Sequence, residues 1–135
     1  MGLTEQERAI LVKLKLEKSE KTLTEARKAA EMQMWATAAN RLYYAAYYAV
    51  SALLLKQGVG VKTHEGVIQM FGLHFVKTGK VQKDVGRMYS DLFNTRLTGD
   101  YDDTFDLEEK DVMPKLDNAE HIIRVVKDCI DERNT

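Results

Sequence analysis

The sequence predicts an all-α fold, an up-and-down helical bundle of four main helices plus one shorter helix. Apolar residues recur at alternating spacings of three and four along most of the chain, which is the period of one helix face. No segment shows the strict alternation that is typical of a strand. The stretch 35–55 is apolar on nearly every side, and a helix of that kind is buried on more than one face. We therefore expect the other helices to pack around it.

Composition narrows the class of protein. A length of 135 residues fits one helical domain over residues 1–135, and 44% hydrophobic with 30% charged residues is typical of a soluble chain. The net charge of -1 argues against binding that is dominated by attraction to a nucleic-acid backbone, although it allows a local basic patch. No apolar run is long enough to span a membrane, and the first residues lack the apolar block of a signal peptide. Because the one cysteine, Cys129, has no partner for an internal disulfide, we expect a cytoplasmic protein.

Capping residues and a glycine indicate where the first two helices begin and end. The first is expected over residues 5–31, with Thr4 as its N-cap and glutamates in the first turn, where the helix dipole favours carboxylates. A break at 32–34 separates it from the central helix. That helix is expected to end just before Gly58, which suits the left-handed conformation common after a helix C-terminus.

The short helix and the fourth helix follow. Thr63 is expected to cap the short one, and Thr78-Gly79 to close it. The fourth is expected to begin near Val81 and to end at Gly99. Its apolar stripe follows the helical series i, i+3, i+4, i+7 and i+8 at Val85, Met88, Tyr89, Leu92 and Phe93. The next position of the series is Arg96, so an arginine continues a stripe that is otherwise buried.

The last helix is preceded by an acidic connection. Residues 100–111 contain an aspartate cluster that suits turns. Asp111 is expected to cap the helix, with Pro114 in the first turn, where its missing N–H does little harm.

Arg96 is the sharpest functional signal in the sequence. A guanidinium on a buried stripe has to be paired, or has to face an interface or a ligand, because an unpaired buried charge is costly. One interpretation is a bridge to Asp100 or to a neighbouring aspartate that fastens the following loop to the helix end. The other is an arginine presented to a phosphate, with Tyr101 beside it.

A second candidate surface lies on the central helix. Tyr44 and Tyr48 are one turn apart, and Arg41 precedes them by about one turn. Aromatic stripes of this kind are common in cores, but tyrosine hydroxyls seek partners and are frequent at interfaces. This side of the helix is therefore either core or the wall of a ligand site or dimer interface.

Lys62 and His64 flank the expected N-cap Thr63, at a helix start whose backbone N–H groups attract anions. The simpler interpretation is a capping threonine with two exposed neighbours. The sequence does not predict a metal site, because no pair of histidines or cysteines has a ligand spacing such as His-x3-His or Cys-x2-Cys. No phosphate-binding glycine loop occurs either, and we expect no cofactor.

Three blocks of the chain together resemble the HEPN superfamily (higher eukaryotes and prokaryotes nucleotide-binding domains), and above all its small stand-alone prokaryotic members. The blocks, in this order, are NRLYYAAYYAVSALLLKQGV, KTHEGVIQMFGLHFVKTGK and LFNTRLTGDYDD. The resemblance covers about residues 5–130. It implies a helical bundle that commonly forms a homodimer with a cleft between the subunits. Many members are ribonucleases of toxin–antitoxin or other defence systems, and others act with a minimal nucleotidyltransferase.

The ribonuclease motif of that family is an arginine, a polar residue, and a histidine a few residues further on. The arginine maps to Arg96, but Leu97 stands at the polar position and the histidine window holds Tyr101, Asp102 and Asp103. A phenol ionises near pH 10, so tyrosine is a poor general base at neutral pH. The resemblance therefore favours a dimeric module, non-catalytic or weakly catalytic, that binds RNA, a nucleotide, or a nucleotidyltransferase or antitoxin partner.

The alternative function is a metal-independent RNA endonuclease that uses Arg96 and Tyr101 in the dimer cleft, with Lys62 and His64 contributing if they reach it. Under either function the spare face of the central helix, with Arg41, Tyr44 and Tyr48, is expected to face the cleft. A third hypothesis is a purely structural helical dimer in which Arg96 makes only an internal bridge.

Overall fold

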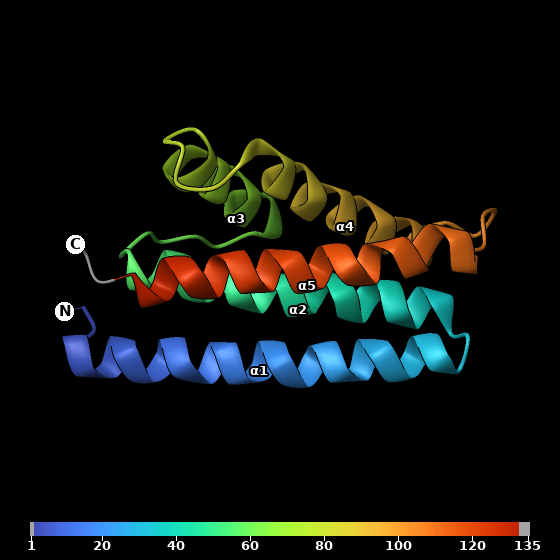
Figure 1. The fold of residues 1–135 in the computed structure, drawn as a ribbon, viewed down its shortest axis with the longest axis horizontal. Helices are drawn as coiled ribbons and strands as arrows, with labels where there is room; N and C mark the ends of the chain where they lie inside the picture. The colour runs from blue at the N-terminus through green and yellow to red at the C-terminus, as the bar shows by residue number, and fades with distance from the viewer. Residues whose placement is uncertain (1, 133–135) are drawn as a thin grey trace.

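The computed structural model describes residues 2–132 and forms a helical bundle (Figure 1). Its elements are α1 (Glu5–Glu31), α2 (Trp35–Lys56), α3 (His64–Phe71), a π-helical turn η1 (Gly72–Val76), α4 (Lys83–Tyr101) and α5 (Glu109–Asp131). The long helices α1, α2, α4 and α5 run alternately in opposite directions (Figure 1). No strand occurs within these residues. The predicted all-α, up-and-down bundle with one shorter helix is confirmed.

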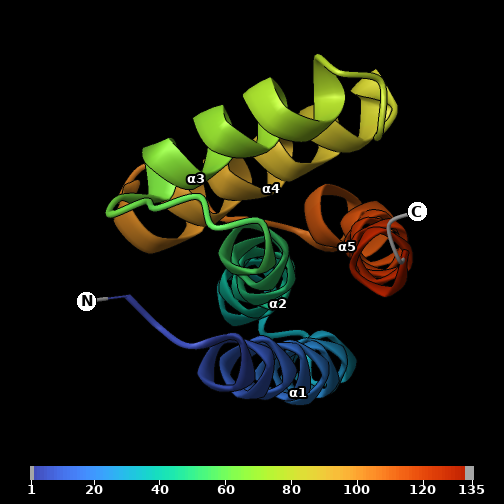
Figure 2. The same cartoon turned by 90° about the vertical axis from the view of Figure 1, so that its left-hand side faces the viewer.

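Helix α2 is the centre of the molecule and packs against α1, α3, α4 and α5. Figure 2 shows it end-on between α1, α5 and the α3–α4 layer. Its small residues let neighbouring backbones come close: the Ser19 hydroxyl of α1 donates to the Ala45 carbonyl at 2.7 Å, and both residues are fully buried. The fully buried residues of α2 are Ala38, Leu42, Tyr43, Ala45, Ala46, Ala49, Val50, Ala52, Leu53 and Leu54. The expectation that the other helices surround this stretch is therefore correct.

Local capping explains where several helices begin and end. Thr4 and Glu7 form a reciprocal capping box at the start of α1. The Thr63 hydroxyl accepts from the Gly66 N–H at 2.8 Å at the start of α3. After α2, Gly58 has φ 75°, the left-handed conformation that glycine adopts without strain.

The predicted end of α4 is wrong. The helix continues through Gly99 to Tyr101. A Cβ on Gly99 would lie 2.8 Å from Leu107 Cδ1 and 3.4 Å from the Ala36 backbone, so the glycine allows close packing against α2 rather than ending the helix. The start is also shifted: Val81 is buried but lies before the helix, which begins at Lys83.

The predicted cap of α5 is also shifted. Glu108 is the N-cap, and Asp111 is the third helical residue, which completes a capping box with Glu108. Pro114 therefore lies in the second turn rather than the first. The short helical segment closes as expected. After η1 ends at Val76, the Thr78 hydroxyl donates to the His74 carbonyl at 2.9 Å, and Gly79 makes the turn with φ 81°.

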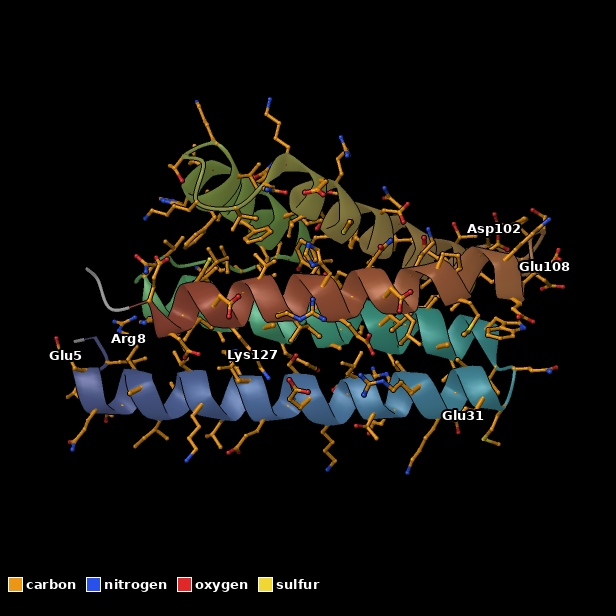
Figure 3. All side chains as sticks on the ribbon, viewed as in Figure 1. Glu5, Arg8, Glu31, Asp102, Glu108 and Lys127 are labelled. Atoms are coloured by element: carbon orange, nitrogen blue, oxygen red, sulfur yellow. The ribbon has the colours of Figure 1, made fainter. Side chains whose placement is uncertain are left out.

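Ion pairs on the surface tie the layers together. Lys127 of α5 pairs with Glu20 of α1, and Figure 3 shows Lys127 between these two helices. Asp102 and Glu108 mark the two ends of the α4–α5 connection at one end of the bundle (Figure 3). None of the helices in residues 2–132 combines the length and hydropathy that crossing a bilayer requires.

Candidate functional site

Arg96 lies on the inner side of α4 and is 8% exposed. Its Nε donates to Asp100 Oδ2 at 3.1 Å, one turn further along the same helix. The two terminal nitrogens have no hydrogen-bond partner among residues 2–132, and neither is a fully buried unpaired atom. The bridge to Asp100 therefore uses one edge of the guanidinium and leaves its terminal fork open.

Three tyrosine rings surround the guanidinium. Its central carbon lies 5.3 Å from the ring centroid of Tyr44, 5.5 Å from that of Tyr43 and 5.8 Å from that of Tyr101. Cations are attracted to aromatic faces over such distances. Burial disfavours the charged form, but the hydrogen bond and negative charge of Asp100 outweigh it and raise the pKa of Arg96. The site thus keeps a positive charge in a largely apolar setting.

A chain of polar side chains continues from Asp100 onto α2. Asn40 Nδ2 donates to Asp100 Oδ2 at 3.0 Å, and Asn40 Oδ1 accepts from Arg41 Nε at 3.0 Å. Arg41 also lies over the Tyr44 ring at 5.4 Å and pairs with Glu25 of α1. Tyr44 therefore has one arginine from its own helix and one from α4 within cation–π distance.

His64, the first residue of α3, belongs to the same cluster. Its Nδ1 lies 2.8 Å from the Tyr43 hydroxyl. Its ring centroid lies 4.7 Å from that of Tyr47, 5.6 Å from that of Tyr44 and 5.7 Å from that of Tyr43. Burial of the ring and the positive charge of Arg96 lower the pKa of His64, against a smaller opposing effect of Glu65.

The lowered pKa predicts a pH dependence of stability. The folded protein favours the neutral imidazole, so the unfolded chain binds more protons once the pH falls below the ordinary histidine value of about 6.5. The free energy of unfolding contributed by His64 is complete above that pH and falls with acidification until the folded-state pKa is passed. Urea unfolding at several pH values between neutral and mildly acidic should show a smaller loss for His64→Gln than for the natural protein.

His74 provides the matched control, because it is exposed on η1. His74→Gln should leave the pH dependence of unfolding as in the natural protein. An equal acid sensitivity of the natural protein and of His64→Gln would contradict the expected shift.

The structure gathers most, but not all, of the predicted site residues. Arg96, Asp100, Tyr101, Arg41, Tyr44 and His64 all lie in this cluster. Tyr48 lies at its edge, 6.0 Å from Tyr44, with the Lys18 ammonium of α1 over its ring at 4.7 Å. Lys62 is exposed, and its side chain has no hydrogen bond or ion pair within the described residues. The structure therefore does not bring Lys62 into the cluster.

Sequence reasoning missed three members of the cluster: Asn40, Tyr43 and Tyr47, whose ring lies nearest to His64. Asn40 connects Asp100 to Arg41, and its position one turn before Tyr44 was the only signal available. Tyr43 has the local signature of a core aromatic residue on the central helix, yet its hydroxyl lies 2.8 Å from His64 Nδ1. Burial raises the pKa of Tyr43 well above its ordinary value, so this hydroxyl stays protonated.

No cluster of three or more histidine, cysteine, aspartate or glutamate side chains suited to a metal ion occurs in residues 2–132. The chemistry of the cluster is that of two guanidinium groups, one carboxylate, one imidazole and several phenols. Such groups bind anions, stack on planar ligands and exchange protons at the imidazole.

The fold and the cluster define a class: a small antiparallel helical bundle that presents an arginine near the end of its third long helix, α4, against tyrosines of a central helix. A sequence model of the HEPN domain matches residues 12–129. The chain belongs to the HEPN domain family.

Individual relatives agree with this assignment. A UPF0332 protein of Thermotoga maritima is 42% identical over 96 residues, which are 71% of this chain and 73% of that protein. A Methanocaldococcus jannaschii protein with the name "Putative toxin MJ0142" is 29% identical over 119 residues, 88% of this chain and 81% of that protein. The crystal structure of TT1696 from Thermus thermophilus has the same fold, with a TM-score of 0.75 over 87% of this chain and 97% of that one at 18% identity.

Proposed function

We propose that this protein is the HEPN component of a toxin–antitoxin or nucleotidyltransferase-linked two-component system, and that it binds a phosphate group of RNA or of a nucleotide at Arg96. The observation that carries the proposal is the open terminal fork of an arginine that is otherwise buried and paired. The names of two Methanocaldococcus jannaschii relatives, both putative toxins, support the type of system.

The geometry favours a phosphate over a single-point anion. A guanidinium fork donates two parallel hydrogen bonds, and phosphate oxygens accept them in the same geometry. Asp100 holds Nε, so the side chain is oriented before any ligand arrives, which reduces the entropy lost on binding. Tyr101 is 69% exposed next to this fork and offers a ring face on which a base can stack.

We propose a homodimer as the working form, with the Arg96 sites of two subunits facing one cleft. The support is a group of aromatic side chains that a single chain leaves accessible to a partner. Tyr44 and Tyr48 are only partly buried, and Tyr101 and Phe105 are exposed. Light scattering at micromolar concentration should report twice the monomer mass, and a clean monomer would contradict this part of the proposal.

The experiment that tests the binding site is fluorescence anisotropy with a labelled single-stranded RNA of mixed sequence. Arg96→Ala should weaken binding by about tenfold or more, because one bidentate charged contact contributes about 1.5–3 kcal/mol. Arg96→Lys, which keeps the charge but loses the fork, should recover only part of the affinity.

Arg27→Ala is the matched control, since Arg27 pairs with Glu120 on the surface between α1 and α5. It should bind RNA as the natural protein does. Melting curves of all three variants separate loss of binding from loss of folding. Unchanged RNA affinity in a folded Arg96→Ala protein would overturn the proposed site.

A second candidate function is a metal-independent RNA endonuclease, in which Arg96 holds the scissile phosphate and Tyr101 exchanges a proton. The observation in its favour is the approach of the Arg96 guanidinium to the Tyr101 ring at 5.8 Å. Growth arrest on expression that Arg96→Ala and Tyr101→Phe both abolish would support this function. Intact RNA after long incubation with the purified protein would rule it out.

A further inference from the structure

We propose that two copies of this chain pair so that the α4–α5 connection of each copy docks in a groove of the other copy, beside the first turns of α4. This inference rests on the proposed homodimer and names the surfaces that form it. The groove begins at the first residue of α4, and the connection follows its last residue (Figure 1). A continuous helix of 19 residues spans about 28 Å, so one chain cannot bring its own connection into its own groove.

The groove has a volume of about 720 Å³ and lies between α3, η1, α4 and the nearest side chain of α5. Its lining combines half-buried apolar side chains with exposed polar ones, and includes Ile68, Val76, Lys83, Arg87, Asn94 and Asn118. Asp91 also lies on the lining, but it pairs with Lys115 of α5. An apolar floor with a polar rim is the arrangement that receives an anchoring side chain of a protein partner.

The end of the molecule that contains the groove is basic. Lys83 and Arg87 lie on the groove, and Lys77 and Lys80 precede it between η1 and α4. All four side chains are exposed, and none has an ion pair within residues 2–132. Asp84 is the one acidic residue in the sequence from Lys77 to Arg87. The groove is therefore suited to an acidic partner segment.

The α4–α5 connection has the complementary character. Every residue from Asp102 to Asp106 is exposed, and Asp103 also lies in this stretch. None of these three aspartates has an ion pair within the part of the chain that the structure describes. Phe105 lies among them and is 46% exposed. The Asp102 carboxylate accepts hydrogen bonds from the N–H and the hydroxyl of Thr104, at 2.9 Å and 2.8 Å, so the turn before the ring is ordered before any partner arrives.

An antiparallel pair of α4 helices brings both surfaces together at once. When two copies of a helix run in opposite directions about a twofold axis, the basic start of each lies beside the acidic end of the other. The same contact is then made twice, and the assembly closes as a dimer. The axis crosses α4 about midway between Arg87 and Asp103, close to the level of Arg96. This pairing therefore sets the two Arg96 sites at similar levels of one dimer.

The ring and the charges have different roles in this contact. Transfer of the Phe105 ring from water to an apolar groove favours association, and aromatic anchors of this kind dominate the affinity of many interfaces. Ion pairs that stay exposed to water contribute little each and are screened by salt. Like charges that are brought together oppose association much more strongly. Removal of the ring should therefore weaken the dimer, and reversal of the charges should decide which copies pair.

The test exchanges charges between two variants of the full chain, with the dimer measured by sedimentation velocity at micromolar concentration. Lys83→Glu with Arg87→Glu reverses the groove, and Asp103→Lys with Asp106→Lys reverses the connection. Each variant alone should raise the dissociation constant of the dimer by about 100-fold or more, because like charges meet at both contacts. A mixture of the two should form dimers that contain one copy of each, with nearly natural affinity, because opposite charges then meet at both contacts.

The matched control is Lys13→Glu with Lys21→Glu, which makes the same change of charge at two exposed lysines of α1. It should dimerise as the natural protein does. Phe105→Ala should weaken the dimer by about 30-fold or more and leave the helical content unchanged, because the ring is partly exposed in the single chain. Ile10→Ala removes a side chain of α1 that is 58% exposed, and it should change neither quantity.

The outcomes separate failure of this inference from failure of the proposed function. A natural dimer that either reversed variant keeps, or that mixing does not restore, would overturn the docking of the connection and leave the proposed homodimer standing. In that case the groove is available to a different protein. A monomeric natural protein would overturn both. A variant that merely failed to fold would not recover on mixing, so recovery supports the reciprocal contact itself. The anisotropy measurement with RNA tests the Arg96 site independently of these results.

Discussion

Replacing Leu53 with alanine is expected to reduce the free energy of unfolding by about 3–4 kcal/mol, within the range measured for leucine truncations in packed cores. Leu53 is fully buried in α2, the helix that contacts all four other α-helices. Truncation removes apolar contacts and leaves a cavity that rigid neighbours on several sides cannot close. Small domains have a total stability of about 5–15 kcal/mol, so this one change removes a large part of it.

Leu14→Ala is the matched control, because Leu14 lies within α1 and is 52% exposed. The two substitutions are chemically identical, and alanine has a high helix propensity at both positions. Urea unfolding should show a change within about 0.5 kcal/mol for the control. Similar losses for both variants would mean that α2 is not the packing centre of the bundle.

Replacing Phe71 with alanine is expected to cost about 3 kcal/mol or more and to loosen the whole of α3. Phe71 is 1% exposed and its ring lies against Phe75 and Tyr89, at 6.1 Å and 5.9 Å between centroids. Helix α3 has only eight residues, and Val67 is its other fully buried side chain. A short helix depends on such packing, because its own hydrogen bonds do not make it stable.

The same substitution should change His64, although Phe71 does not touch it. Loosening of α3 returns the imidazole to solvent and moves it away from Arg96, so the His64 pKa should rise toward its ordinary value. An NMR titration of the Phe71→Ala protein measures this. Leu73→Ala, at a 47% exposed position of η1, is the control and should leave both the stability and the pKa unchanged. If folded Phe71→Ala protein has the same His64 pKa as the natural protein, α3 does not position the imidazole ring.

The ends of the helices could be predicted from the sequence wherever residues close to one another in the chain determine them. The capping box at Thr4, the turn at Gly58 and the cap at Thr63 all involve residues within a few positions of one another. Gly99 was misassigned because its role is set by a contact with Ala36, which is remote in sequence. In the sequence, a glycine that ends a helix looks the same as a glycine inside the last turns of a helix that allows close packing.

The candidate site could be predicted only in part for the same reason. Arg96 was detectable as a charged residue on an apolar stripe, and Asp100 as its partner one turn later. The approach of His64 to the same cluster depends on the path of the chain between α2 and α4, which periodicity does not reveal. Without that path, Tyr101 was the nearest proton-transfer group, although His64 has the more suitable chemistry.

Helix α2 supplies more of the buried core than any other helix, and it supplies three of the rings that surround Arg96 and His64. A randomised library aimed at a new ligand preference would therefore lose most of its members to unfolding if it varied residues of this helix. The start of α3 carries His64, and the last two turns of α4 carry Arg96 and Tyr101, on elements with fewer core residues than α2. Diversity placed at those two segments leaves the scaffold intact, which makes them the practical targets for altering what the bundle recognises.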